Sequence, residues 1–176
     1  RLLRLEGSKW QYNGKRLNVY AAVDFAYSLN RAADWTAIVV IGIDADSNIY
    51  VLDIERFKTK KIVEYFEKMA EVTVAQVVIV EAIKDYVKQR GLTLSIVEFR
   101  PTRQEGTKEQ RIAAALEARY DDNKVWHFEG GWTQVLEEEL VQARPAHDDV
   151  KDALASAVTI AIKPQRSSQS AIQDFF

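Results

Sequence analysis

The sequence contains no cysteine, and this absence excludes several classes of site. Without thiols the chain can form no disulfide and no cysteine-based zinc or iron–sulfur centre. Its 2 histidines, His127 and His147, are too few for an all-imidazole metal site. Any metal ion must therefore be bound through oxygen atoms.

Long hydrophobic runs and an excess of basic charge are also absent. The longest apolar runs, such as residues 36–43, fall far short of the roughly 20 residues that span a bilayer, and residues 1–4 do not lead into a signal peptide. We therefore expect an intracellular chain that contacts no membrane. Lys and Arg total 24 against 26 Asp and Glu, so the formal net charge is −2 and no global basic field attracts nucleic acid. DNA binding would need local basic patches, or metal ions that offset an acidic site.

A phosphate-binding loop of the Gly-x-x-x-x-Gly-Lys-Ser/Thr type is missing as well. The nearest stretch, from Gly7 to Lys15, has the wrong spacing and no Ser or Thr after the lysine. We therefore expect no ATP binding of that kind. The 176 residues, 47% of them hydrophobic, are enough for one soluble domain that buries its own core.

Glycine and proline are scarce, at 7 and 3 residues, so the elements are predicted from hydrophobic periodicity. Residues 17–24, 36–43 and 49–55 are apolar runs rich in β-branched side chains, which is typical of strands. The turn composition of residues 44–48 predicts a hairpin between the last two runs. These runs predict an antiparallel meander of three strands.

The middle of the chain alternates between helical and extended patterns. An amphipathic helix is predicted at residues 59–71, where apolar side chains recur three and four positions apart. Residues 76–81 and 94–99 are short apolar runs typical of buried strands, and a short helix is predicted between them at 82–90. This alternation predicts a βαβ unit with parallel strands.

Helices are also predicted in the last third of the chain, at residues 107–119, 132–143 and 150–161. The first of them begins with the spacing of a capping box. A short strand is predicted at 124–128, and the helix that follows it carries Glu137–Glu139 on its polar face. The closing helix has the most regular apolar stripe of the chain.

Together these elements predict an α/β domain at residues 17–163. Its central mixed sheet combines the antiparallel three-strand meander with parallel strands and is flanked by helices. Residues 164–176 are polar and predict a flexible C-terminal tail.

Carboxylates occur where strands end. Asp24 ends the first strand of the meander within an apolar run, and Glu81 ends the strand at 76–81 in the same way. A carboxylate in such a place is costly unless it is paired or binds a cation. Because open α/β sheets place their sites at the ends of neighbouring parallel strands, the two acids are candidates for one site.

A third acidic group begins the closing helix. On the helical wheel, Asp149 flanks the apolar stripe, whereas Asp148 and Asp152 point more nearly away from it. Asp149 is therefore the best placed of the three to face Asp24 and Glu81. The structural alternative is that these acids only cap the helix and oppose its dipole.

A group of carboxylates without cysteine or a histidine cluster suits hard cations such as Mg²⁺ or Mn²⁺. Two such ions about 4 Å apart can activate a water and stabilise the leaving oxygen of a phosphodiester. The acidic residues therefore predict nuclease chemistry.

The sequence resembles the nuclease domain of the large terminase subunit of tailed bacteriophages. The resemblance is carried by Asp24 in VYAAVDFAYS, Glu81 in VVIVEA, TKEQRI at 107–112 and HDDVKDALASA at 147–157, and it covers about residues 17–162. It implies a ribonuclease H-like fold. It also implies a metal-dependent endonuclease that cuts concatemeric double-stranded viral DNA during genome packaging, in the cytoplasm of the host cell and outside the mature virion.

The resemblance also implies roles for single residues. Asp24, Glu81 and Asp148 or Asp149 correspond to catalytic metal ligands for Mg²⁺ or Mn²⁺ in a two-metal site. Further positions near these ligands are His147, Asp152 and Asp34. For His147 the alternative is a residue of the helix cap region, and for Asp34 it is an acid in a turn.

Basic residues beside this site are candidates for DNA contacts. Lys84 lies three residues after Glu81, and a basic group consisting of Arg100, Arg103, Lys108 and Arg111 follows the strand at 94–99. A second basic cluster consists of Arg56, Lys58, Lys60 and Lys61. Either group can contact phosphates or form an ordinary solvated face.

The implied partners are double-stranded DNA, the portal protein, the small terminase subunit and a packaging ATPase domain that precedes the nuclease. Residues 1–16 would then be the end of the interdomain connection. Two other functions stay open at this point. One is a resolvase or recombinase nuclease of the same fold acting on branched DNA, and the other is a non-catalytic module that docks on the portal.

Overall fold

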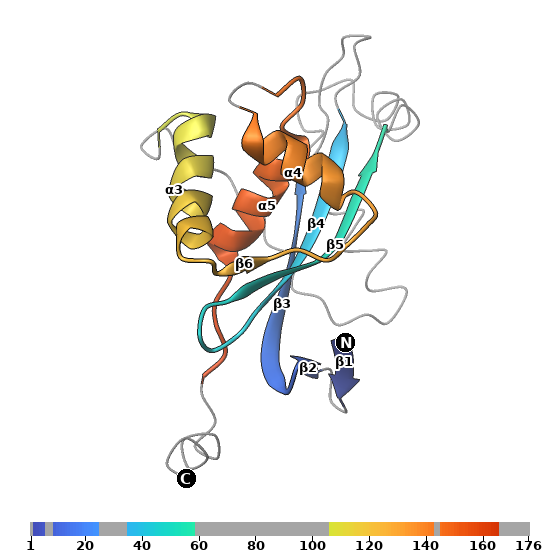
Figure 1. Ribbon diagram of the computed structural model, residues 1–176, viewed down its shortest axis with the longest axis vertical. Helices are drawn as coiled ribbons and strands as arrows, with labels where there is room; N and C mark the ends of the chain where they lie inside the picture. The colour runs from blue at the N-terminus through green and yellow to red at the C-terminus, as the bar shows by residue number, and fades with distance from the viewer. Residues whose placement is uncertain (1, 6–8, 25–34, 59–105, 143–144, 166–176) are drawn as a thin grey trace, which may run out of the picture.

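The computed structural model describes residues 2–5, 9–24, 35–58, 106–142 and 145–165 of the chain (Figure 1). The helix predicted at 59–71 and the βαβ unit predicted at 76–99 lie outside the described residues, and so does most of the predicted tail. The fold is therefore described from the sheet and from the helices of the last third of the chain.

The described strands form one sheet in the spatial order β1-β2-β3-β4-β5-β6. The strands are β1 (Leu2–Leu5), β2 (Lys9–Tyr12), β3 (Lys15–Asp24), β4 (Thr36–Ile43), β5 (Ile49–Phe57) and β6 (Val125–Trp126). β3, β4 and β5 are antiparallel neighbours, which confirms the predicted meander. β6 runs parallel to β5, so the sheet is mixed as predicted.

The turn between β4 and β5 is built around one buried acid. Asp44 is only 1% exposed, and its carboxylate accepts hydrogen bonds from the backbone amides of Asp46 and Asn48, both at 2.9 Å. The side chains of Asn48 and Tyr50 donate to its other oxygen, at 2.8 and 3.1 Å. Asp44 is thereby satisfied within the turn, where Asp side chains are favoured for this reason.

Strands β1 and β2 were not predicted. A tight hairpin joins β2 to β3 through Asn13 and Gly14, whose φ angles are 47° and 77°. Asn-Gly is the preferred pair for such a turn because both positions need positive φ. The sequence interpretation placed residues 1–16 in an interdomain connection. Parts of that segment form strands of the same sheet, and the role in connecting domains stays a prediction.

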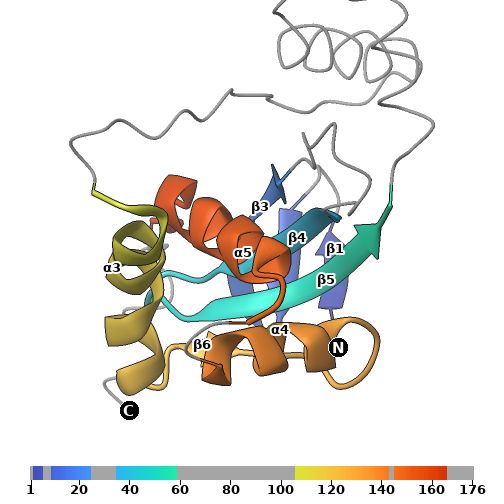
Figure 2. The ribbon, with the colours of Figure 1, turned by 90° about the horizontal axis from the view of Figure 1, so that it is seen from above.

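Three helices are described: α3 (Lys108–Asp121), α4 (Thr133–Val141) and α5 (Asp149–Ile160). α3 begins with the predicted capping box, in which Thr107 and Gln110 exchange hydrogen bonds. The apolar stripe of α5 is buried on the sheet as predicted, against β3 and β4. α3 and α4 each pack against α5, from different directions (Figure 2). None of the described helices is long and apolar enough to cross a membrane.

One prediction about α4 was wrong. Glu139 was expected on the polar face with Glu137 and Glu138, but it is buried, with 4% exposure. On a helical wheel Glu139 lies roughly 60° from the fully buried Leu136, so it flanks the apolar stripe, and α5 packs against that flank.

Candidate functional site

The end of β3 meets the start of α5 because the two elements lie side by side in opposite directions. Asn18 and Tyr20, in the first part of β3, donate hydrogen bonds to the carbonyl oxygen of Ile162, just after α5, at 2.9 and 3.1 Å. The helix then returns along the strand, so its acidic first turn approaches Asp24 at the strand end (Figure 1).

The pKa of Asp24 is shifted by the acids of α5 that approach it. Asp24 is half-buried, and its pKa is raised to about 7, first by burial and then by the negative charge of Asp152. Lys108 opposes the shift, whereas Asp149 and Asp148 add to it. Asp24 and the acids of α5 therefore form one acidic cluster. The acidic cluster consists of Asp24, Asp148, Asp149 and Asp152.

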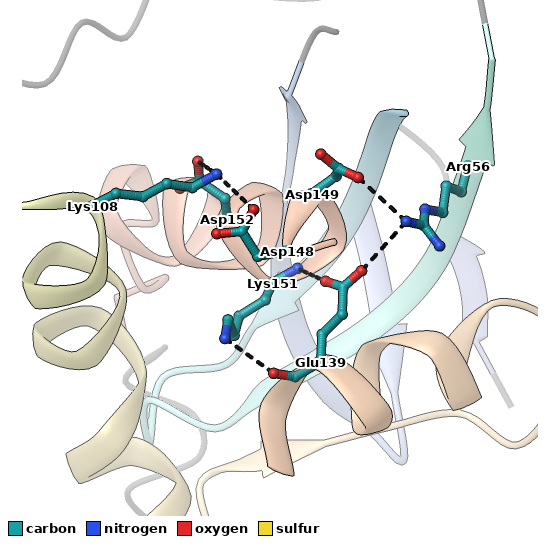
Figure 3. A network of polar contacts seen from close by, with 7 residues as sticks. All are labelled: Arg56, Lys108, Glu139, Asp148, Asp149, Lys151 and Asp152. Atoms are coloured by element: carbon teal, nitrogen blue, oxygen red, sulfur yellow. Dashed lines mark hydrogen bonds and ion pairs between the residues drawn. The ribbon is translucent and has the colours of Figure 1, made fainter. Parts of the chain in front are cut away.

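Within this cluster, Asp148 and Asp152 share a lysine (Figure 3). Nζ of Lys108, in the first turn of α3, lies 2.9 Å from Oδ1 of Asp148 and 3.1 Å from Oδ2 of Asp152. Burial opposes the charge of this amine, but the two carboxylates hold the pKa of Lys108 above its usual value. Asp152 was predicted to point away from the apolar stripe of α5. Helix α3 packs against α5 and brings Lys108 to Asp152.

Asp149 instead contacts an arginine from the sheet. Nη2 of Arg56, near the end of β5, donates to Oδ2 of Asp149 at 3.3 Å. The Arg56 side chain is 9% exposed, and its guanidinium lies 4.7 Å from the ring centre of Trp35. Arg56 was expected to contact phosphate or solvent, but in this arrangement its charge serves the acidic cluster.

Glu139 completes the network and was missed as a site residue. Its Oε1 lies 3.9 Å from Nη2 of Arg56, and its Oε2 accepts a hydrogen bond of 2.8 Å from the backbone amide of Lys151. Burial raises its pKa to about 7, against the opposing effects of the Lys151 amide and Arg56. The signal in the sequence was its place beside the apolar stripe of α4, the same criterion that ranked Asp149 first.

Helix capping does not account for Asp148. It occupies the N-cap position of α5, yet its side chain makes no capping hydrogen bond. The carboxylate is turned to Lys108 instead. The structural alternative that the acids of α5 serve only as caps is therefore not supported for this residue.

Of the other predicted site residues, the structure describes two, Arg111 and His147. Arg111 lines a cavity of about 430 Å³ between α3 and α5, together with Arg119, Asp152 and Thr159. His147 is exposed just before α5. The remaining predicted residues, Glu81, Asp34, Lys84, Arg100 and Arg103, lie outside the described residues.

The chemistry of the acidic cluster fits a hard divalent cation. All its potential donors are carboxylate oxygens, which Mg²⁺ and Mn²⁺ prefer. Burial and the neighbouring acids raise the pKa of Asp24 despite the opposing charge of Lys108, so a cation would stabilise its ionised form. Within the ranges that the structure describes, which exclude Glu81, no group of three or more His, Cys, Asp or Glu side chains is arranged to hold a metal ion.

Comparison with known proteins identifies a family. A family model described as the terminase RNaseH-like domain matches residues 21–160, which include the whole acidic cluster and nearly all of the sheet from β3 onward. Neither the curated proteins nor the solved structures gave a match.

Proposed function

Since the chain belongs to the terminase RNaseH-like domain family, we propose that it is a divalent-metal-dependent endonuclease that cleaves concatemeric double-stranded viral DNA during genome packaging. The observation that carries the proposal is the position of Asp24. It lies half-buried at a strand end, with its pKa raised to about 7 by burial and by the acids of α5. A cluster of this kind, with like charges close together, is typical of a functional site.

In this proposal Asp24, Asp149 and Asp148, together with Glu81, hold one or two Mg²⁺ or Mn²⁺ ions. When bound, such ions activate a water and stabilise the leaving oxygen of the cleaved phosphodiester. The protein's own contribution is to fix the carboxylates. Arg56 contacts Asp149 from the sheet, and Lys108 contacts Asp148 from α3.

Lys108 has a second role in this proposal. It is an expected DNA contact, yet its amine pairs with Asp148 and Asp152. A metal ion held by Asp148 would reduce the negative charge that faces this amine, which would then be available to a phosphate oxygen. Arg111, in the same first turn of α3, extends the positive charge toward the cavity between α3 and α5. Lys84, Arg100 and Arg103 stay predicted DNA contacts.

The biological setting is part of the proposal. We infer that the domain acts in the host cytoplasm with a packaging ATPase domain, the portal protein and the small terminase subunit. With a net charge of −2, the domain offers no strong DNA attraction of its own, which supports delivery of DNA by such partners.

The test is cleavage of supercoiled and linear double-stranded DNA across a titration of Mg²⁺ and Mn²⁺. We expect cleavage by the wild-type chain, its loss in Asp24→Asn, and its retention in the control Asp121→Asn, which changes an exposed acid at the end of α3. A four-way DNA junction assayed in parallel separates the proposal from a resolvase. Cleavage by Asp24→Asn at the wild-type rate would contradict the assignment.

A further inference from the structure

Helix α5 has its N-terminal cap supplied by another helix. A helix usually begins with a side chain that accepts a hydrogen bond from the backbone amide two or three residues later. Asp148 holds that position and makes no such bond, whereas the amide of Lys151, three residues on, donates to Glu139 of α4 at 2.8 Å. The Lys151 amine also donates to the Glu139 carbonyl oxygen at 3.0 Å. Glu139 thus performs the capping that Asp148 would ordinarily perform.

This exchange has a direct effect on the acidic cluster. A capping carboxylate points along the backbone of its own helix and is occupied by amides. Because Glu139 takes the amide of Lys151, the carboxylate of Asp148 is free to contact Lys108 on the other side. Figure 3 shows the two carboxylates on separate sides of the first turn of α5.

Glu139 also forms an ion pair with the arginine that contacts Asp149. Nη2 of Arg56 lies 3.3 Å from Asp149 and 3.9 Å from Glu139, so one guanidinium group spans both acids (Figure 3). The aromatic ring of Trp35 limits its movement on another side. Because a guanidinium is planar, its contacts with Trp35 and with the two acids restrict its orientation more than they would restrict that of a lysine amine.

We propose that Glu139 and Arg56 are positioning residues for the acidic cluster: Glu139 caps α5 and holds Arg56, and Arg56 sets the direction of the Asp149 carboxylate. The inference rests on the proposed nuclease function and assigns to these two residues no contact with DNA or metal. Their contribution is the geometry of the carboxylates.

Three variants of the full chain separate positioning from charge and from folding. Arg56→Lys keeps the net charge but removes the planar group. Glu139→Gln keeps an oxygen that can accept from the Lys151 amide but removes the charge facing Arg56. The matched control is Glu138→Gln, one residue away on the exposed side of α4. Each variant is measured for its melting temperature, its Mn²⁺ affinity by calorimetry, and its kcat for DNA cleavage at saturating Mn²⁺.

We expect Arg56→Lys and Glu139→Gln to remain folded and to lose about 10- to 100-fold in kcat at saturating Mn²⁺, the scale of a misplaced reacting group. Their Mn²⁺ affinity should also be weaker than that of the wild type, and Glu138→Gln should match the wild type in both. If Arg56→Lys and Glu139→Gln had the kcat and the Mn²⁺ affinity of the wild type, the inference would be overturned, but the proposed function would stand. A wild-type chain that neither binds Mn²⁺ nor cleaves DNA would overturn the proposed function, and the inference with it.

Capping by Glu139 has a readout that requires no metal. Hydrogen exchange of the Lys151 amide should be at least about tenfold faster in Glu139→Ala than in Glu138→Ala, because only the first change removes the acceptor. Equal exchange rates in these two variants would overturn the capping part of the inference.

Discussion

The amine of Lys108 lies 2.9 Å from the carboxylate of Asp148, which joins the first turn of α3 to the first turn of α5. The same amine reaches Asp152 at 3.1 Å, so a single lysine compensates two acids of the cluster. Lys108 thus provides positive charge beside two carboxylates that a bound cation would also neutralise.

Replacing Lys108 with Met should destabilise the metal-free chain and make its stability respond more strongly to Mn²⁺. The side chain is 35% exposed, so solvent screens the ion pairs and the expected loss is about 1 kcal/mol. Mn²⁺ should recover more stability in the variant than in the wild type, because the ion takes over the compensation of Asp148 and Asp152. Urea unfolding with and without Mn²⁺ measures both effects.

The control for this prediction is Lys163→Met, which removes an exposed lysine beyond α5. It should leave the free energy of unfolding and its response to Mn²⁺ unchanged. An equal Mn²⁺ response in Lys108→Met and the wild type would contradict the prediction.

The raised pKa of Asp24 predicts a pH-dependent penalty on stability. Its pKa is about 7 in the folded chain against an ordinary value of 3.8, so between these values the folded state binds a proton that the unfolded state has lost. Stability from this group therefore falls as the pH rises through that interval, by at most about 4 kcal/mol. Asp24→Asn cannot ionise and escapes the penalty.

Without metal, Asp24→Asn should therefore be more stable than the wild type at pH 8, with the difference vanishing toward pH 4. Urea unfolding at several pH values measures it, and Asp121→Asn is the control. A constant difference between Asp24→Asn and the wild type across this range would show that Asp24 has an ordinary pKa.

At about pH 4.5, where the raised pKa of Glu139 costs little stability, replacing Glu139 with Ala should lower the free energy of unfolding by about 2 kcal/mol. The change removes the cap of α5, which is a loss of about 1 kcal/mol in typical proteins, and leaves the buried Arg56 with Asp149 as its acidic partner. Glu138→Ala, on the exposed side, should change stability by less than about 0.5 kcal/mol. Equal losses in the two variants, measured by urea unfolding, would contradict the burial argument.

DNA affinity should be weak and should depend on Arg111 and Arg119, which line the cavity between α3 and α5. Removing one ion pair between an arginine and a phosphate should reduce the slope of log affinity against log salt by about 0.9. Arg111→Gln should therefore weaken binding and lower the slope, whereas Arg16→Gln, an exposed change in the first part of β3, should do neither. Anisotropy titrations at several salt concentrations give the slopes.

Nanomolar affinity of the wild-type chain at physiological salt would contradict the expected weak binding. Identical slopes for Arg111→Gln and the wild type would exclude Arg111 as a phosphate ligand.

Periodic patterns predicted β4 and α5 well because each contains a regular run or stripe of apolar residues that is buried. The strand at 36–43 has the bounds that were predicted, and α5 differs by one residue at either end. The strands at β1 and β2 were missed because they are short and carry no long apolar run. Their signal was the Asn13-Gly14 pair, which predicts a turn only when the flanking residues are recognised as strands.

The acidic cluster was only partly predictable. The end of a strand and the flank of an apolar stripe singled out Asp24 and Asp149, since both signals are local, and the charge of Asp149 adds to the raised pKa of Asp24. The partners Lys108, Arg56 and Glu139 come from three other elements, and no local pattern encodes which charges meet across helices. In the sequence, Glu139 belongs to a run of three glutamates typical of a solvated face, and only the packing of α5 against α4 shows that it is buried.

The stacking of Arg56 on Trp35 makes the intrinsic fluorescence of Trp35 sensitive to changes at the site. The guanidinium of Arg56 lies 4.7 Å from the ring centre of Trp35, and the amine of Lys58 lies at the same distance. An indole with two cations so near has an emission that depends on where those cations are. A ligand that draws Arg56 or its acidic partner toward itself changes the fluorescence of Trp35, and a chain in which the other tryptophans are replaced by Phe reports this without any added label.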